Sequence, residues 1–273
     1  MEFRTVVHIE HPKWQVVPAE RILFVGSCFA DRIGHRFADE HFPVTVNPYG
    51  VMYNPVSILH TLERMREDGE GETSAFTLAV LTLGTNHVYV EKKTGEIVDN
   101  CQKRPQQLFE ERELSVDECA DTLERIVSTL KTWNPDIRIL LTVSPIRYQK
   151  YGFHGSQLSK ATLLLAVDRV LRGNPDVADY FPAYEIVNDE LRDYRFYNPD
   201  MLHPSEQTVE YIWQRMVETY FSDAARKFLE EWQPIKQALG HRPFNPDSVA
   251  YQNFKEQTAR SLAAFDRKYG LRR

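Results

Sequence analysis

The sequence lacks the excess of basic residues that a nucleic-acid-binding protein needs. Its 273 residues include 33 Lys and Arg against 39 Asp and Glu, which gives a formal net charge of −6. Proteins that bind the phosphate backbone of nucleic acids present a positively charged surface to it. We therefore expect no nucleic-acid partner.

Long apolar runs and secretory signals are also missing. No apolar run approaches the roughly 20 residues that a membrane span requires, and the N-terminus "MEFRTVVHIEHPKWQ" has no basic segment followed by an apolar one. The three cysteines, Cys28, Cys101 and Cys119, are odd in number, far apart and without CxxC spacing. This pattern is typical of free thiols in a reducing compartment. We expect a cytoplasmic globular protein that makes no membrane contact, while its oligomeric state is left open.

Motifs for common cofactors and for one large hydrolase class are absent too. No pair of residues has metal-ligand spacing, and neither GxxxxGK nor a complete GxGxxG occurs. We therefore expect no cofactor and no metal. The G-x-S-x-G elbow of the α/β-hydrolases is missing, because Phe29 stands where its second glycine should be.

What the sequence does contain is a series of buried strands that alternate with helices. Strands are predicted at 21–25, 43–46, 78–83, 137–143 and 183–187, and a hairpin at 88–98. Strands that are apolar on both faces and alternate with amphipathic helices indicate a parallel sheet covered on both sides. We expect one α/β catalytic domain over residues 1–235, followed by a helical C-terminal extension over 236–273.

A serine and a cysteine stand where the first strand gives way to a helix. Ser27 at this place can be a nucleophile, because the helix N-terminus favours the negative charge that develops nearby. It can equally be an ordinary N-cap. A serine nucleophile needs a base and a group that orients the base. Asp200 and His203 supply both at a spacing of three residues. Between the neighbours Ser27 and Cys28, we favour Ser27 and expect Cys28 to pack inertly in the core.

Small polar residues follow the next two strands and are candidates for binding an oxyanion. Gly50 offers a backbone N–H and Asn86 a side-chain amide, beside the N–H of Ser27 itself. Gly and Asn are also ordinary turn residues, so each alone is a weak signal. The order Ser, Gly, Asn, Asp-x-x-His is the block order of the SGNH hydrolases.

The motifs together resemble one family closely. "FVGSCFADRIG", "NPYGVMYNP", "TVSPIR", "LSKATLL" and "YNPDMLHPSEQTVEYIW" are similar to the GSCFA domain family, which belongs to the SGNH hydrolases. The resemblance covers residues 20 to 235. It implies a flavodoxin-like three-layer α/β/α sandwich with about five parallel strands, and a triad of Ser27, Asp200 and His203.

The chain also departs from the pattern of that family. Members usually read GTAW where this chain has "GTNH" at 84–87, and they tend to carry histidine where it has Gln102 and Tyr148. Asn47 and Asn100 therefore remain alternatives to Asn86 for the oxyanion amide. The residues proposed for substrate contacts are Asn47, Tyr53, His87 and Asn100. The aromatic side chains within 194–197 are candidates to line an acyl or sugar pocket, although packing in the core is the favoured interpretation.

The predicted function is that of a serine esterase acting on an acyl or acetyl ester, with a carbohydrate-linked ester as the favoured class. Transfer of the acyl group to an acceptor other than water is an alternative. Two others are a non-catalytic binding module on a hydrolase fold and a thiol enzyme that uses Cys28.

Overall fold

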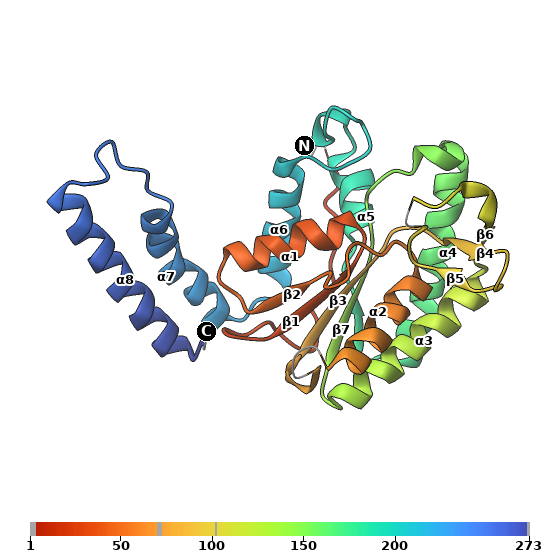
Figure 1. The fold of residues 1–273 in the computed structure, drawn as a ribbon, viewed down its shortest axis with the longest axis horizontal. Coiled ribbons are helices and arrows are strands. Elements are labelled where there is room, and N and C mark those ends of the chain that lie inside the picture. The colour runs from red at the N-terminus through yellow and green to blue at the C-terminus, as the bar shows by residue number, and fades with distance from the viewer. Residues whose placement is uncertain (1–3, 70–72, 102, 272–273) are drawn as a thin grey trace.

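A computed structural model describes residues 4–69, 73–101 and 103–271 (Figure 1). Gln102, one of the departures from the family pattern, lies outside these residues. The centre of the fold is a sheet of five parallel strands in the order β2-β1-β3-β7-β8. The strands are β1 (Ile22–Gly26), β2 (Val44–Val46), β3 (Leu78–Leu83), β7 (Arg138–Val143) and β8 (Ala178–Tyr180). The predicted parallel sheet is confirmed, and so are four of its strands to within one residue at either end.

Helices cover both faces of this sheet, so the predicted three-layer sandwich is confirmed (Figure 1). One face carries α1 (Cys28–Asp39) and α6 (Glu206–Tyr220), and the other carries α2 (Pro55–Asp68), α3 (Val116–Trp133) and α4 (Gly152–Gly173). Local sequence signals begin these helices. Asn54 caps α2 with proline at its first turn, and Ser115 and Glu118 form both hydrogen bonds of a capping box at α3.

The three central strands, β1, β3 and β7, send alternate side chains into two separate cores. Leu23 and Val25 of β1 pack with α2, α3 and α4, whereas Ile22 and Phe24 pack with α1 and α6. Successive side chains of a strand point to opposite faces. This alternation is why the strands are apolar throughout and why periodicity located them.

A smaller antiparallel sheet stands beside the carboxyl ends of the main one. It has the order β5-β4-β6, with β4 (His87–Glu91), β5 (Ile97–Val98) and β6 (Phe109–Glu113). The predicted hairpin is confirmed as β4 and β5, and Gly95 takes the positive φ of 74° in its turn. Strand β6 was not predicted, because four of its five side chains are exposed and leave no hydrophobic pattern.

The strand predicted at 183–187 is wrong. These residues form the short helix α5 (Ala183–Glu185) and enter a π-helical segment, η4 (Ile186–Leu191). Ala183, Ile186 and Val187 are buried, which is helical spacing rather than alternation. The edge strand beside β7 is β8, which has only three residues. Short 3₁₀ turns complete the fold: η1 (Thr73–Ala75), η2 (Gln106–Leu108), η3 (Gln149–Tyr151) and η5 (Tyr194–Phe196).

The C-terminal helices α7 (Asp223–Leu239) and α8 (Val249–Tyr269) extend to one side of the sandwich (blue in Figure 1). They are joined to it through aromatic contacts. Trp232 donates from Nε1 to the carbonyl of Asp39 over 2.9 Å, and its ring stacks on His41 at 4.2 Å. Phe265 of α8 packs in the same core as α1. Within the described residues, no helix combines the length and the apolarity needed to cross a membrane.

Candidate active site

The turn from β1 into α1 holds Ser27 in a tightly packed place. Gly26 has φ of 146°, and a Cβ there would lie 2.2 Å from the carbonyl oxygen of Thr82. Ser27 is the N-cap of α1: its Oγ accepts from the N–H of Phe29 over 3.2 Å and lies 3.1 Å from Thr82 Oγ1. Its own N–H donates to Thr82 O over 3.1 Å. Ser27 is fully buried, so the hydroxyl has to turn away from these partners to meet a substrate.

Cys28 takes a more open position than the sequence suggested. Its side chain is partly buried against the core of α1 and α6, but Sγ also lies 3.6 Å from the hydroxyl of Tyr53. Burial, followed by the hydrogen bond and the charge of Cys28, raises the pKa of Tyr53 to about 12. The phenol therefore stays protonated and can donate to a neighbouring sulfur.

Asp200 and His203 are brought together as their spacing predicts. Oδ2 of Asp200 lies 2.6 Å from Nδ1 of His203, and Oδ1 accepts the backbone N–H groups of Leu202 and His203 over 2.9 and 3.0 Å. The hydrogen bonds from the N–H of His203 and of Leu202 are the main reason why the pKa of Asp200 is lowered to about 2. An ionised Asp200 fixes the Nδ1 proton and leaves Nε2 able to accept one.

Two arginines fasten the turn that carries this pair. Arg32 of α1 donates from Nη1 to the carbonyl of Pro204 over 2.9 Å. Arg147, which follows β7, donates from its backbone N–H to Leu202 O over 3.1 Å and from Nη1 to Met201 O over 2.9 Å. The histidine turn is thereby tied to the helix that Ser27 begins. Neither arginine was predicted, because both contacts join segments far apart in the sequence.

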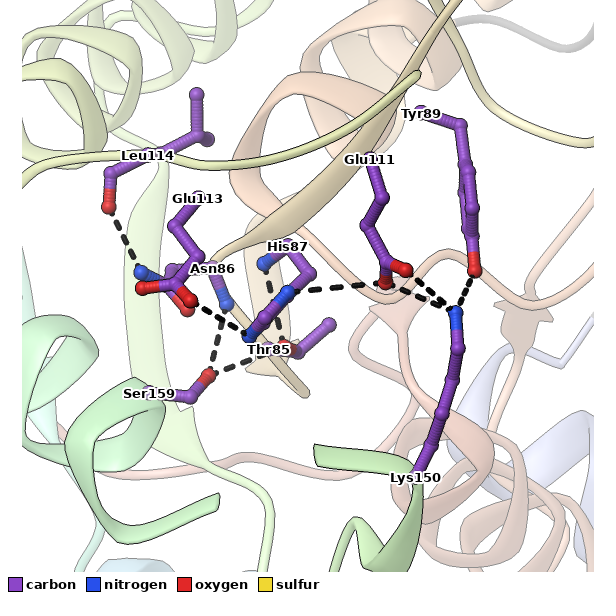
Figure 2. A network of polar contacts seen from close by, with 9 residues as sticks. All are labelled: Thr85, Asn86, His87, Tyr89, Glu111, Glu113, Leu114, Lys150 and Ser159. Carbon is purple, nitrogen blue, oxygen red and sulfur yellow. Dashed lines mark hydrogen bonds and ion pairs between the residues drawn. The ribbon is translucent and has the colours of Figure 1, made fainter. Parts of the chain in front are cut away.

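The expected oxyanion donors already have partners. The N–H of Gly50 donates to Asn47 O over 2.8 Å in a turn where Gly50 is exposed and has φ of 92°. Nδ2 of Asn86 donates to the carbonyl of Leu114 over 2.7 Å, while its buried Oδ1 has no hydrogen-bond partner within the part of the chain that the structure describes. Figure 2 shows the amide of Asn86 directed at Leu114, with its backbone N–H on Ser159.

The remaining candidates differ in their surroundings. Oδ1 of Asn47 accepts the N–H of Gly26 over 2.9 Å and so supports the turn before Ser27. Tyr53 accepts the N–H groups of Gly84 and Thr85 at its carbonyl, each over 2.8 Å, which holds the loop after β3 beside the same turn. Asn100 is exposed, in the segment after β5.

His87 belongs to a polar network on the small sheet (Figure 2). Its ring stacks on Tyr151 at 3.5 Å, and its two nitrogens lie 3.7 and 3.8 Å from carboxylate oxygens of Glu111 and Glu113. Burial lowers the pKa of His87, and the two carboxylates oppose that shift. The contacts of the imidazole are therefore with Tyr151 and with the carboxylates of β6. No group of three metal-ligating side chains occurs among the residues that the structure describes.

A buried lysine joins the loops beneath the site. Lys160 of α4 donates from Nζ to the carbonyls of Gly84 and Ser144 over 2.6 and 2.7 Å, which links the ends of β3 and β7. Burial lowers the pKa of Lys160 to about 7. One sequence signal could have indicated the role of Lys160. It lies on the apolar face of its helix, at helical spacing from the buried Leu163 and Val167.

Three tyrosines form a row that begins next to Cys28. The ring centroids of Tyr53 and Tyr148 are 6.2 Å apart, and so are those of Tyr148 and Tyr151. The side chain of Tyr148 is partly buried, but its hydroxyl oxygen is completely buried and has no hydrogen-bond partner in residues 4–69, 73–101 and 103–271.

The aromatic group at 194–197 divides between two environments. Phe196 and Tyr197 pack against the core of α1 and α6, as expected, whereas Tyr194 is 66% exposed. Tyr194 and Tyr197 also line a cavity of about 260 Å³ with Arg147, Gln157 and Asn188. The cavity adjoins the turn that Arg147 holds.

Comparisons with known proteins identify one family and several solved structures to which this chain is similar. The model of the GSCFA family matches residues 21–78 and 70–216, and that of the GSCFA C-terminal domain matches residues 232–271. No curated protein matches the sequence. Among solved structures, an acetyl-xylooligosaccharide esterase from Geobacillus has 12% identity and a TM-score of 0.49, covering 77% of this chain and 97% of its own.

Two further solved structures have comparable similarity. A family 3 carbohydrate esterase from Talaromyces cellulolyticus has 9% identity and a TM-score of 0.43, covering 78% of this chain and 99% of its own. A protein from Lactobacillus plantarum has 13% identity and a TM-score of 0.47, covering 76% and 100%. At such identities the similarity concerns the fold alone.

Proposed function

This chain belongs to the GSCFA family, and we propose that it is a carboxylic-ester hydrolase with His203 as its base and Asp200 as the group that orients His203. The observation that carries the proposal is the Asp200–His203 contact of 2.6 Å, on a turn tied to α1. An imidazole that is oriented by a carboxylate beside the start of a helix is the arrangement that acyl transfer requires.

In the proposed reaction, Ser27 Oγ attacks the ester carbonyl and its proton passes to His203 Nε2. The carbonyl electron pair moves to oxygen, and the tetrahedral intermediate collapses with release of the alcohol, which takes the proton from His203. Water then attacks the acyl-serine by the same route, which restores Ser27 and yields the acid. A hydroxyl other than water as the acceptor would make the protein an acyl transferase.

We propose an acetyl or other short acyl ester as the substrate, with a carbohydrate as the favoured alcohol. The exposed ring of Tyr194 and the amides of Gln157 and Asn188 around the 260 Å³ cavity support this class. Aromatic faces and amide groups together suit the apolar and hydroxyl faces of a sugar ring. We further propose that the protein acts in the cytoplasm, consistent with its free thiols.

A second nucleophile is favoured by one observation. Cys28 is partly exposed and faces the hydroxyl of Tyr53, whereas Ser27 is fully buried and its Oγ already has two hydrogen-bond partners, Phe29 and Thr82. A thiolate that accepts a hydrogen bond at a helix N-terminus is a good nucleophile. The second candidate function is therefore thiol-dependent acyl transfer, with the acyl group carried on Cys28 Sγ.

Two reagents distinguish these functions. We expect a fluorophosphonate probe to label Ser27, and turnover of p-nitrophenyl acetate to be lost in Ser27→Ala but largely kept in Cys28→Ala. Labelling of Cys28 by iodoacetamide with parallel loss of turnover, together with an active Ser27→Ala, would assign the reaction to the thiol. A folded wild-type protein that reacts with neither reagent and turns over no ester would instead be a binding module.

A further inference from the structure

Tyr148 presents a hydroxyl group that the fold leaves unused. Its Oη is fully buried and has no hydrogen-bond partner among the described residues. A buried hydroxyl without a partner destabilises the folded state, so native structures rarely contain one unless it has a role outside the fold.

The hydroxyl of Tyr148 lies close to Gly84. A side-chain carbon built on Gly84 would lie 2.6 Å from Tyr148 Oη and 3.3 Å from Ser27 Cβ. Tyr148 Oη and Ser27 thus border the same small space, which exists because residue 84 has no side chain. Cys28 lies on the same side, because its Sγ is 3.6 Å from the hydroxyl of Tyr53, and the rings of Tyr53 and Tyr148 are 6.2 Å apart.

The groups expected to bind an oxyanion are occupied. The N–H of Ser27 donates to Thr82 and that of Gly50 to Asn47. The amide of Asn86 is turned to Leu114. A tetrahedral intermediate at Ser27 or Cys28 still needs donors for its oxygen.

We propose that the hydroxyl of Tyr148 is a catalytic donor to the oxyanion that forms when the nucleophile attacks the ester. The inference rests on the proposed function and holds for either nucleophile. Attack moves the carbonyl electron pair onto oxygen, and Tyr148 donates a hydrogen bond to that oxygen without losing its proton. When the carbonyl reforms, the hydrogen bond is released and the phenol is unchanged.

The environment keeps this phenol in its donor form. Burial, as the largest cause, raises the pKa of Tyr148 well above its ordinary value. The ammonium of Lys160 lies 5.1 Å from the centre of the Tyr148 ring and holds the loop of Gly84 in place. In the resting protein, Oη of Tyr148 has no acceptor. The oxyanion provides one only in the transition state, so the new hydrogen bond stabilises the transition state relative to the ground state.

The test is Tyr148→Phe, which removes one oxygen atom. We expect kcat for p-nitrophenyl acetate to fall about 10²- to 10³-fold, as when a single oxyanion donor is lost, with KM changed less than threefold. The melting temperature should stay the same or rise, because an unpaired buried hydroxyl has been removed. The matched control is Tyr220→Phe, since Tyr220 is a buried phenol whose hydroxyl donates to Tyr180 O over 3.3 Å in the opposite core. This control should keep kcat.

Each other outcome has a definite meaning. A Tyr148→Phe protein with kcat within threefold of an active wild type would overturn the inference while leaving the proposed function intact. If Tyr148→Phe and Tyr220→Phe both have a lower melting temperature and lose kcat equally, the hydroxyl of Tyr148 has a structural role. This result would also overturn the inference. A wild type that neither turns over the ester nor reacts with the fluorophosphonate probe or iodoacetamide would overturn the proposed function, and the role of Tyr148 with it.

Discussion

The guanidinium of Arg32 donates to the carbonyl oxygen of Pro204 over 2.9 Å, although the two residues are 172 positions apart. Arg32 lies in the helix that Ser27 begins, and Pro204 directly follows His203. This bond therefore ties the turn of the proposed base to the helix of the proposed nucleophile. Catalysis depends steeply on the placement of such groups, because a misplacement of about 1 Å can cost a factor of 10².

We predict that Arg32→Met lowers kcat/KM for p-nitrophenyl acetate by roughly 10- to 100-fold, because the His203 turn is no longer tied to α1. The loss of stability should be about 1.5 to 3 kcal/mol, the usual contribution of one hydrogen bond that involves a charged group. Urea unfolding and steady-state kinetics measure the two effects. The control Arg64→Met removes an exposed arginine that pairs with Asp68 within α2. Equal kinetics in the two variants would argue against a positioning role.

We predict that His203→Ala abolishes nearly all activity. The loss of kcat in Asp200→Asn should be equal to or smaller than the loss in His203→Ala. Asp200 orients the imidazole and stabilises its charged form but carries no proton. Adding His203→Ala to Ser27→Ala should cost little beyond either single change, since members of a triad act as a unit. Kinetics of the single and double variants measure this.

Stability provides the check on that interpretation. Asp200 is 44% exposed and Oδ1 of an asparagine can still accept the two backbone N–H groups, so the melting temperature of Asp200→Asn should hardly change. A large fall in melting temperature, with activity falling in proportion, would identify the turn as structural and favour the binding-module interpretation.

We predict that Gly84→Ala removes activity and destabilises the protein by roughly 1 to 3 kcal/mol, the usual cost of overpacking. The added carbon would lie 2.6 Å from Tyr148 Oη and 2.9 Å from the backbone carbonyl of Tyr53. Gly240→Ala is the control, because its added carbon would meet nothing nearer than 3.5 Å. Unfolding and ester hydrolysis of both variants are measured. A Gly84→Ala protein as stable and active as the wild type would contradict the packing around residue 84.

We predict a specific pH dependence of stability from Lys160. Its pKa is about 7 in the folded protein against an ordinary 10.5. Between these values the unfolded chain binds a proton that the folded protein does not. The free energy of unfolding should therefore rise with pH, by up to about 1.4 kcal/mol per pH unit. Below about pH 7 both states hold the proton and this slope vanishes.

The measurement compares wild type with Lys160→Met in urea at pH 6, 8 and 9. The variant is expected to be less stable at pH 9, because the carbonyls of Gly84 and Ser144 lose their donor. The difference between the two proteins should shift in favour of the wild type as the pH rises. A difference that is constant with pH would show that Lys160 keeps its proton when folded.

The sequence predicted those features that depend on local pattern. Strand β3 was located at 78–83 because all six of its side chains are buried, and the Asp200–His203 pair because three residues of separation fit one turn. The edge strand β8 was missed because its sequence, ADY, contains no apolar run, whereas the equally short edge strand β2 was located from Val44 and Val46. Residues 183–187 were wrongly predicted to form a strand, because the spacing of their apolar residues fits either a strand or a helix.

The surroundings of the site could not be predicted in the same way. Asn86 follows β3 as expected, but the partner of its amide is Leu114, which follows a strand with an exposed and charged sequence. Whether a turn residue has a free donor depends on such distant partners. The position of Tyr148 above Gly84 is likewise fixed by packing between the loops after β3 and β7.

The division of the interior into two cores has a consequence for how the chain is synthesised. The core facing α2, α3 and α4 is complete once Ala178 has left the ribosome. The opposite core needs Phe221, Phe228 and finally Phe265, so α1, made among the first residues, waits for partners from the end of the chain. Among the elements made early in translation, α1, which Ser27 caps, is thus the last whose apolar face is buried by its partners. A nascent chain halted before α6 should expose it to chaperones and proteases.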